Sequence, residues 1–139
     1  MPNILIIDDE TSIRVTLCEF LKQEGYEVIT AENVQTAMQR LKEYDIDVVL
    51  SDIIMPQDSG ISLLKHVHEV SPDIRVIMMT GEPTVDTAVE AIRLGAHDYL
   101  AKPVYRSALI KAVGHAVRYK QLIDEKRILE QQNQAQREN

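Results

Sequence analysis

Short apolar runs that each end in a polar group constrain the fold of this chain more than any other feature of its sequence. Four of them read ILIIDDE, VVLSDIIMP, VIMMTG and DYLAKP in chain order, and longer stretches with a helical period separate them. Dense apolar runs of this length are typical of parallel strands that are covered on both faces. Strict alternation of strands and helices predicts one parallel sheet with right-handed crossovers and helices on both faces.

The apolar pattern predicts five strands, which are expected at Ile4–Ile7, Tyr26–Thr30, Ile46–Leu50, Ile74–Met79 and Asp98–Ala101. Between them, apolar residues recur at helical spacing. Thr11 or Ser12 can cap the first helix, and Gly25 suits its end. Val85, Ala88, Val89 and Ile92 mark the fourth helix, which Gly95 ends. From about Arg106 the chain stays compatible with a helix as far as Asn139.

Five strands in this length fit a doubly wound, flavodoxin-like α/β fold with strand order 2-1-3-4-5 and an extended C-terminal helix. Open sheets of this kind bind ligands at the carboxyl ends of their strands, beside the switch point between the first and third strands. The polar groups expected at this edge are those of Asp8, Asp9, Asp52, Thr80 and Lys102. Carboxylates, a hydroxyl and an ammonium in one pocket can hold a hard divalent cation and a phosphoryl group together.

Composition excludes several other classes of function. The chain has 139 residues, 22 acidic and 15 basic, and a net charge of −7, so this segment is not expected to bind nucleic acid directly. Its opening MPNILIID has no basic leader region, and no later run approaches a membrane span. Cys18 is the only cysteine, which excludes an internal disulfide and fits a cytoplasmic location. We expect Cys18 to pack in the core.

In order and spacing, these motifs resemble the receiver domain of a two-component response regulator, over residues 3 to about 118. The resemblance rests on an acidic pair after the first strand, an Asp followed by MP and a Gly after the third, a Thr after the fourth and KP after the fifth. It implies that Asp52 accepts a phosphoryl group from a sensor histidine kinase. It also implies that the domain is a regulatory phosphoacceptor rather than an enzyme in its own right.

The resemblance assigns roles to the other site residues. Mg²⁺ would bind directly to Asp9, Asp52 and the backbone carbonyl of Ile54, and mainly through water to Asp8. These oxygen ligands suit the octahedral geometry that this ion demands. Lys102 and Thr80 would bind phosphoryl oxygens, and Tyr99 would be the switch aromatic that turns inward when Thr80 moves. The Lys102–Pro103 bond would be cis. Phosphorylation would act on the face formed by the helix at Val85–Leu94, the strand at Asp98–Ala101 and the last helix.

One segment, MTGEPTVDTAVEAIRLGAHDYLAKP, together with the helical tail, is most similar to receivers of the nitrogen-regulatory type. Proteins of this type activate sigma-54-dependent transcription. This similarity implies an output module beyond residue 139 and a role in transcription regulation. Tyr105 departs from the pattern, because many relatives carry an acidic or hydroxyl helix cap after KPV.

The predicted domains are a receiver at 1–118 and a helical linker at 119–139. If Tyr119, Lys126 and Asn133 occupy the first heptad position, Leu122 and Leu129 occupy the fourth, with Ile123 beside them. The linker is then either a solvated helix or a short coiled coil. We expect a homodimer joined by the switch face, by the linker or by both.

Three alternatives remain at this point. The chain could be a stand-alone receiver that acts by protein binding, or a Mg²⁺-dependent phosphohydrolase with Asp52 as nucleophile. The phosphohydrolase would need a general acid, and no acidic residue stands two positions after Asp52. A nucleotide-binding flavodoxin-like domain would need a glycine-rich or hydroxyl-rich first loop, whereas DDETS is acidic and has no glycine. No metal-binding or catalytic role is expected of the histidines at 66, 68, 97 and 115.

Overall fold

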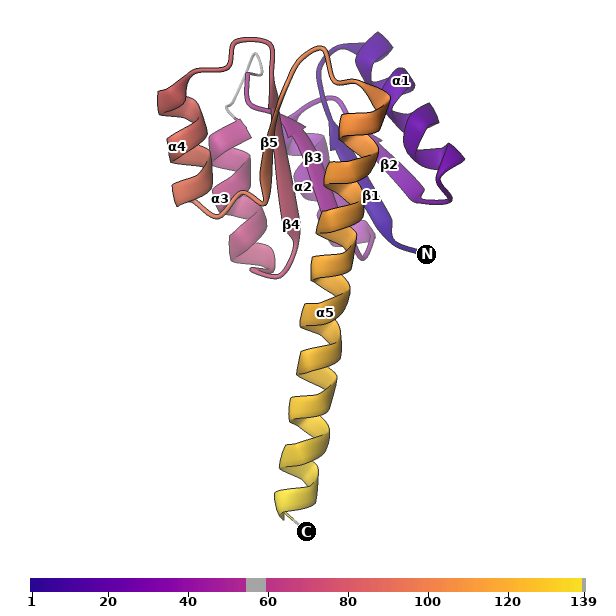
Figure 1. The fold of residues 1–139 in the computed structure, drawn as a ribbon, viewed down its shortest axis with the longest axis vertical. Coiled ribbons are helices and arrows are strands. Elements are labelled where there is room, and N and C mark those ends of the chain that lie inside the picture. The colour runs from indigo at the N-terminus through magenta and orange to yellow at the C-terminus, as the bar shows by residue number, and fades with distance from the viewer. Residues whose placement is uncertain (55–59, 139) are drawn as a thin grey trace.

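The computed structural model of the chain describes residues 1–54 and 60–138 and has the predicted α/β architecture (Figure 1). Five parallel strands form one sheet in the order β2-β1-β3-β4-β5. The strands are β1 (Asn3–Ile7), β2 (Glu27–Ala31), β3 (Val48–Asp52), β4 (Arg75–Thr80) and β5 (Asp98–Ala101). The helices are α1 (Thr11–Gln23), α2 (Val34–Glu43), α3 (Gly60–Val70), α4 (Val85–Arg93) and α5 (Arg106–Glu138).

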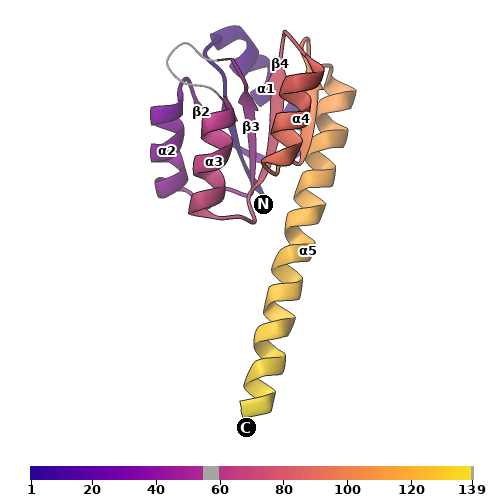
Figure 2. The same ribbon diagram turned by 90° about the vertical axis from the view of Figure 1, so that its left-hand side faces the viewer.

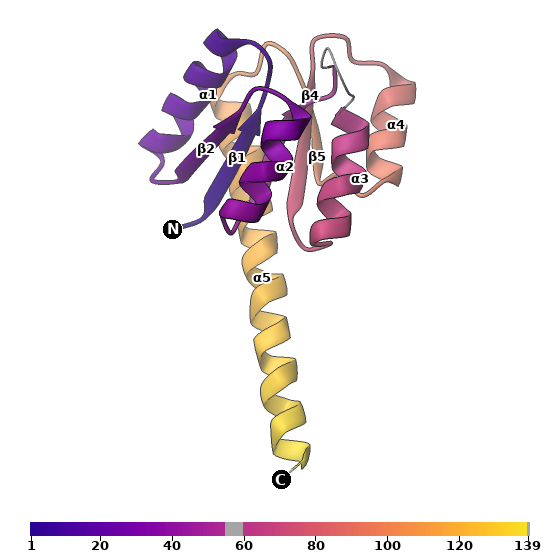
Figure 3. The ribbon, with the colours of Figure 1, turned by 180° about the vertical axis from the view of Figure 1, so that it is seen from behind.

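Two apolar layers sandwich the sheet. Side chains of a strand alternate between its faces, so Leu5 and Ile7 point to one layer while Ile4 and Ile6 point to the other. The first layer is covered by α2 and α3, with Ala91 of α4 at its margin, and the second by α1 and α5. Figure 1 has α1 and α5 in front of the sheet, Figure 3 has α2 and α3 in front, and Figure 2 shows the two layers edge-on. The continuous apolar runs therefore reflect burial on both faces.

Strand register sets the polar edge. Ile7 lies opposite Ser51, so Asp8 and Asp52 follow at the same level on neighbouring strands. Asp52 lies opposite Met79, which places Thr80 one residue further along β4. Thr80 lies opposite Ala101, and Lys102 comes next. The predicted strand ends therefore meet at one edge of the sheet.

The helix ends differ from the sequence prediction in one place. Neither Thr11 nor Ser12 caps α1, because Glu10 occupies the cap position and makes no side-chain cap hydrogen bond. The helix begins one residue earlier than a Thr11 cap allows and two earlier than a Ser12 cap allows, since the Arg14 N–H donates to the Glu10 carbonyl at 3.1 Å. Gly25 ends α1 with a φ of 89°, as the sequence predicts.

The last helix begins at Arg106 although Tyr105 has no capping side chain. The Leu109 N–H donates to the Tyr105 carbonyl at 3.0 Å, so the backbone alone closes the first turn. From there α5 runs for 33 residues as one helix. Its first part covers the sheet, and the rest extends away from it (Figure 1). Among the described residues, no helix combines the length and the apolar character needed to cross a membrane.

Three of the four apolar residues that mark α4 face solvent. Val85, Val89 and Ile92 are exposed, and Ala91 is the buried residue of this helix. An apolar stripe at helical spacing normally marks the side of a helix that meets the core, and α4 departs from this rule. The start of α4 is set by a reciprocal capping box between Thr84 and Thr87.

Gly60 has no room for a side chain. A Cβ there would overlap the Asp52 carbonyl oxygen and lie 2.7 Å from Ile53 Cα, and both are backbone atoms. We expect Gly60→Ala to lower the free energy of unfolding by about 1–3 kcal/mol, as overpacking does. The measurement is urea unfolding followed by circular dichroism.

Gly114→Ala is the matched control. Gly114 lies inside α5, and a Cβ added there meets no atom within 4 Å. The helix propensity of alanine predicts stabilisation by about 0.5–1 kcal/mol. Equal effects of the two substitutions would show that the close approach at Gly60 is unimportant.

Candidate functional site

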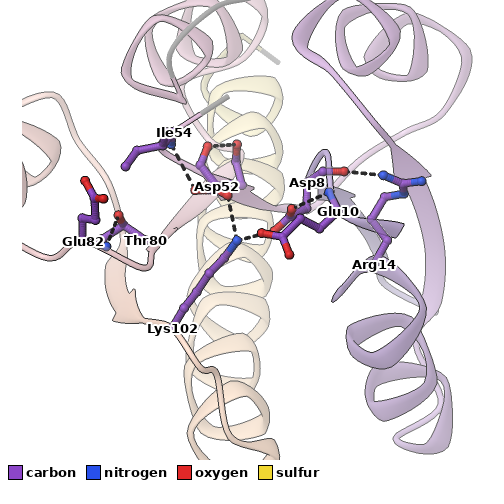
Figure 4. Close-up of polar contacts among 9 residues, drawn as sticks. Asp8, Glu10, Arg14, Asp52, Ile54, Thr80, Glu82 and Lys102 are labelled. Carbon is purple, nitrogen blue, oxygen red and sulfur yellow. Dashed lines mark hydrogen bonds and ion pairs between the residues drawn. The ribbon is translucent and has the colours of Figure 1, made fainter. Parts of the chain in front are cut away.

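The Lys102 ammonium lies between two carboxylates at the carboxyl edge of the sheet (Figure 4). Its Nζ donates to Asp8 Oδ2 and to Asp52 Oδ2, at 2.7 Å in both cases. Asp8 and Asp52 are buried, and the Lys102 side chain is only 12% exposed. Ionic hydrogen bonds of this length are strong, and each carboxylate needs such a partner when water is excluded.

Asp8 is held from two further directions. Its Oδ1 accepts a hydrogen bond from the Glu10 N–H at 2.9 Å, and its carbonyl accepts one from Arg14 at 2.6 Å. Asp9 and Glu10 are exposed beside it. One carboxylate oxygen from each of these three acidic residues can be chosen so that all lie within 4.8 Å of one another. The cluster thus offers hard oxygen ligands at the rim of the pocket.

Asp52 is fixed by the turn that follows β3. Its Oδ1 accepts a hydrogen bond from the Ile54 N–H at 3.0 Å, and the Ser51 hydroxyl donates to its carbonyl at 3.0 Å. The Gly60 N–H donates to the Ile53 carbonyl at 2.7 Å, which holds the start of α3 against this turn. The MP motif lies at residues 55 and 56, outside the described residues.

Thr80 and Lys102 approach the same edge from neighbouring strands. Thr80 is buried, and its Oγ1 accepts a hydrogen bond from the Glu82 N–H at 3.0 Å (Figure 4). The Lys102 N–H donates to the Thr80 carbonyl at 2.7 Å, so the two backbones are tied together. Gly81 leaves the space beside Thr80 open. The Lys102–Pro103 peptide bond is cis.

Tyr99 has a partner that the sequence did not reveal. Its hydroxyl lies 2.8 Å from Thr87 Oγ1, which also takes part in the capping box with Thr84. The ring packs at the edge of the first apolar layer. The T-x-x-T spacing of Thr84 and Thr87 is the signal for the cap, but nothing in the sequence indicates that Tyr99 joins it. Tyr99 therefore connects β5 to the start of α4.

The charges around Lys102 change its proton affinity. Burial lowers the pKa of this ammonium, but the hydrogen bonds to Asp52 and Asp8 and their negative charges outweigh burial and raise the pKa above its ordinary value. The ammonium therefore stays charged throughout the neutral range, where it can bind an anion.

Residues 4–114 match the family described as the response regulator receiver domain. The chain belongs to this family. It is 34% identical over 114 residues to the DNA-binding transcriptional regulator NtrC of Azospirillum brasilense, covering 82% of this chain and 24% of that protein. It is 38% identical over 117 residues to the transcriptional regulatory protein ZraR of Escherichia coli K12, covering 81% of this chain and 26% of that protein.

Solved receivers have the same fold. The solution structure of the beryllofluoride-activated NtrC4 receiver domain dimer superposes with a TM-score of 0.83 at 37% identity, covering 86% of this chain and 99% of that one. NtrX from Brucella abortus superposes with a TM-score of 0.86 at 32% identity, covering 93% of this chain and 30% of that one. The chain is thus a receiver of the NtrC-like type. It spans about a quarter of the length of the curated relatives it matches.

The raised pKa of Lys102 predicts how stability depends on pH. An ammonium with a raised pKa contributes stability that is fully present below about 10.4, the value for an unfolded chain, and that is lost as the pH rises through the folded value. Without divalent cations, Lys102→Met should lower the free energy of unfolding near neutral pH by roughly 3 kcal/mol, because two buried carboxylates lose their partner. This difference from the wild type should narrow above pH ~10.4.

Urea unfolding between neutral and strongly alkaline pH measures both effects. Lys42→Met, on the exposed side of α2, controls for the loss of one positive charge. A Lys102→Met difference that stayed constant across this pH range would contradict the assignment of the stabilisation to the ammonium.

Proposed function

We propose that Asp52 accepts a phosphoryl group from a phosphohistidine of a sensor histidine kinase and that the aspartyl phosphate acts as a signalling switch. The observation that carries this proposal is the position of Lys102, whose Nζ lies 2.7 Å from a carboxylate oxygen of both Asp8 and Asp52. A buried carboxylate in contact with an ammonium, at the same sheet edge as the Thr80 hydroxyl, is suited to receive a group that brings its own negative charge.

The transfer needs no external proton donor. An oxygen of Asp52 forms a bond to phosphorus while the bond from phosphorus to the kinase imidazole nitrogen breaks, and that electron pair stays on the ring nitrogen. Lys102 exchanges its contact with Asp52 for one with a phosphoryl oxygen and keeps its contact with Asp8. The Thr80 hydroxyl donates a hydrogen bond to a second phosphoryl oxygen. Both contacts stabilise charge that spreads over the equatorial oxygens in the transition state.

Mg²⁺ fits the oxygen donors at this edge. Exposed Asp9 would bind the ion directly, together with Asp52 and the Ile54 carbonyl, and the fully buried Asp8 would act mainly through water. When bound, Mg²⁺ neutralises charge on the phosphoryl group and orients it. The octahedral preference of Mg²⁺ suits a few carboxylate and carbonyl ligands completed by water.

Replacing Asp52 tests the phosphoacceptor assignment. We expect Asp52→Asn to abolish phosphorylation by a small phosphodonor with Mg²⁺, because an amide cannot displace a leaving group from phosphorus. Intact mass spectrometry measures the added phosphoryl group, and hydroxylamine treatment checks that it is an acyl phosphate. Asp86→Asn, which removes an exposed carboxylate from α4, should be phosphorylated as the wild type is. A phosphorylated Asp52→Asn protein would refute the assignment.

The proposed signalling switch depends on the position of Tyr99. When Thr80 moves toward the phosphoryl group, Tyr99 can turn into the vacated space and release Thr87, so that α4, β5 and the first part of α5 repack. The hydrogen bond between Tyr99 and Thr87, 2.8 Å long, supports this scheme because it holds the ring toward α4 before the switch.

Tyr99→Phe tests the switch, because it keeps the ring and the capping box but removes this hydrogen bond. We expect the amide resonances of α4 and β5 to move partway toward their beryllofluoride-bound positions, as the balance of two packings changes. Tyr105→Phe is the matched control, since this ring is exposed. Identical spectra for Tyr99→Phe and the wild type would contradict the role of the hydrogen bond.

We infer that the switch regulates an output module in a longer protein, since the chain spans about a quarter of its NtrC-like relatives and these are named as transcriptional regulators. The proposed organisation is a receiver at 1–118 followed by a helical linker at 119–139. A homodimer is proposed through the face of α4, β5 and α5, through the linker, or through both. The solved NtrC4 receiver is described as a dimer, which supports this assembly.

A further inference from the structure

The part of α5 that extends beyond the sheet is tied back to the body by charged side chains. Lys120 Nζ lies 2.8 Å from both carboxylate oxygens of Asp124 and 3.6 Å from Asp47 Oδ1. About two turns further along the helix than Lys120, Arg127 pairs with Asp73. These contacts lie at the amino-terminal edge of the sheet, the edge opposite the phosphoacceptor pocket. Figure 1 shows α5 leaving the body at this end, where the N-terminus also lies.

One of the acidic partners on the body, Asp47, is also held by a contact within the body. Asp47 Oδ2 accepts a hydrogen bond from the Asn3 N–H at 2.9 Å, and the Asn3 amide donates to the Asp45 carbonyl at 2.8 Å. The Asp73 side chain is only 15% exposed, in the loop that precedes β4. A carboxylate with few remaining degrees of freedom loses little entropy when it binds a cation, so these pairs differ from ordinary surface ion pairs.

The aromatic ring of Tyr119 on α5 also contacts the body near these charge pairs. The Arg75 guanidinium, at the start of β4, lies 4.7 Å from the centre of the Tyr119 ring, and His97 meets the same ring edge-on at 5.8 Å. Between the helix and the body runs a groove of about 520 Å³, lined by Asp45, Asp47 and Asp73 on one side and by Lys120, Asp124 and Arg127 on the other. Opposite charges therefore line the junction.

The environment keeps Lys120 charged. Burial lowers the pKa of this ammonium, but the hydrogen bond to Asp124 and the negative charges of Asp124, Asp47 and Asp45 outweigh burial and raise the pKa above its ordinary value. Its side chain is only 14% exposed, although it belongs to the stretch that the sequence marks as linker.

The residues that meet the body occupy one side of the helix. Lys120, Asp124 and Arg127 follow one another at spacings of four and three, which places them in one stripe. Leu122 and Leu129 lie about 180° around the helix from that stripe at 3.6 residues per turn. Both leucines are exposed, at 57% and 58%. The helix thus has a charged side toward the body and an apolar side away from it.

We propose that an ionic latch, formed by Asp47 and Asp73 of the body with Lys120 and Arg127 of α5, fixes the direction of the helix beyond the sheet and turns its leucine side outward. In this arrangement residues 119–127 belong mechanically to the receiver, and the boundary between receiver and linker lies near Arg127 rather than at 118. The latch is independent of the phosphoryl chemistry proposed above, because its residues lie at the opposite edge of the sheet.

Distances between two spin labels test the proposal. In a Cys18→Ala background, labels at Lys42→Cys on α2 and Gln132→Cys on α5 report how α5 is directed relative to the body, and both positions are exposed. Arg127→Gln and Asp73→Asn should each broaden the distance distribution roughly twofold, because the end of the helix then moves more freely. Arg127 is 57% exposed, so its replacement leaves the fold of the body intact. Lys126→Gln, one residue away on an exposed position, should leave the width unchanged.

A charge exchange separates a specific pair from a general charge effect. Asp73→Arg or Arg127→Asp alone should broaden the distribution, whereas the double variant should restore the wild-type width. Amide hydrogen exchange of residues 119–131 gives a second readout, with an expected acceleration of roughly three- to tenfold in each single variant. If the width and the exchange rates stay at wild-type values in Arg127→Gln and Asp73→Asn, the pair of Asp73 with Arg127 does not direct α5, and the latch is refuted. Failure of the double variant to restore the width would refute the specific pairing of Asp73 with Arg127.

Discussion

The contact of one ammonium with two buried carboxylates decides how the carboxyl edge of this sheet is built. Parallel pairing of β1 with β3 brings Asp8 and Asp52 side by side, and their charges repel strongly where water is excluded. Lys102 reaches them from the end of β5, two strands away from β3, and binds both at 2.7 Å. The ends of three strands are therefore held by one cation. A ligand that brings negative charge to this edge must share that cation, which links ligand binding to the position of β5.

The apolar layers explain why the charges gather at this edge. The side chains of β1 from Ile4 to Ile7 and those of β4 from Val76 to Met79 are fully buried on both faces of the sheet. A polar side chain within these stretches would lack water, whereas one that follows the last paired residue can meet partners from neighbouring strands. The close approach of Gly60 to the backbone of Asp52 and Ile53 then sets the turn after β3. The pocket geometry is thus a consequence of strand burial and register.

The sequence predicted the fold class, the strand order and the five strands to within two residues at their ends, because double-sided burial leaves a dense apolar signal. It also predicted that Asp8, Asp52, Thr80 and Lys102 share one edge, since parallel strands end together. The roles of these residues in phosphoryl transfer remain predictions. Helical period could not reveal that most of the apolar stripe of α4 faces solvent, because such a stripe normally marks the side that meets the core. The cap expected at Thr11 or Ser12 was wrong, since the backbone of Glu10 begins α1 instead.

Contacts between distant parts of the chain could not be predicted from the sequence, for a different reason. Tyr99 with Thr87, and Asp73 with Arg127, are pairs of ordinary surface residue types whose proximity depends on how complete helices pack. No local pattern encodes such a pairing. The linker prediction for 119–139 rested on helix compatibility and heptad spacing, neither of which indicates that Lys120 and Arg127 meet the body through charge.

The two edges of the sheet are connected by β4 and α5. β4 carries Thr80 at the pocket and Arg75 at the opposite end, where Arg75 covers the Tyr119 ring of α5. A buried strand paired on both sides transmits a displacement along its length rather than absorbing it. From Arg127 to Glu138 the helix extends about 17 Å at its rise per residue, so a tilt of about 5° moves its far end by about 1.4 Å. A flexible tether would not transmit that displacement beyond a few residues. A helix held to the body through Arg127 would transmit it to the segment that follows Arg127. Under the proposed switch and latch, the stiffness of this junction would decide whether a small repacking near Thr80 produces a directed movement of α5 or only added mobility.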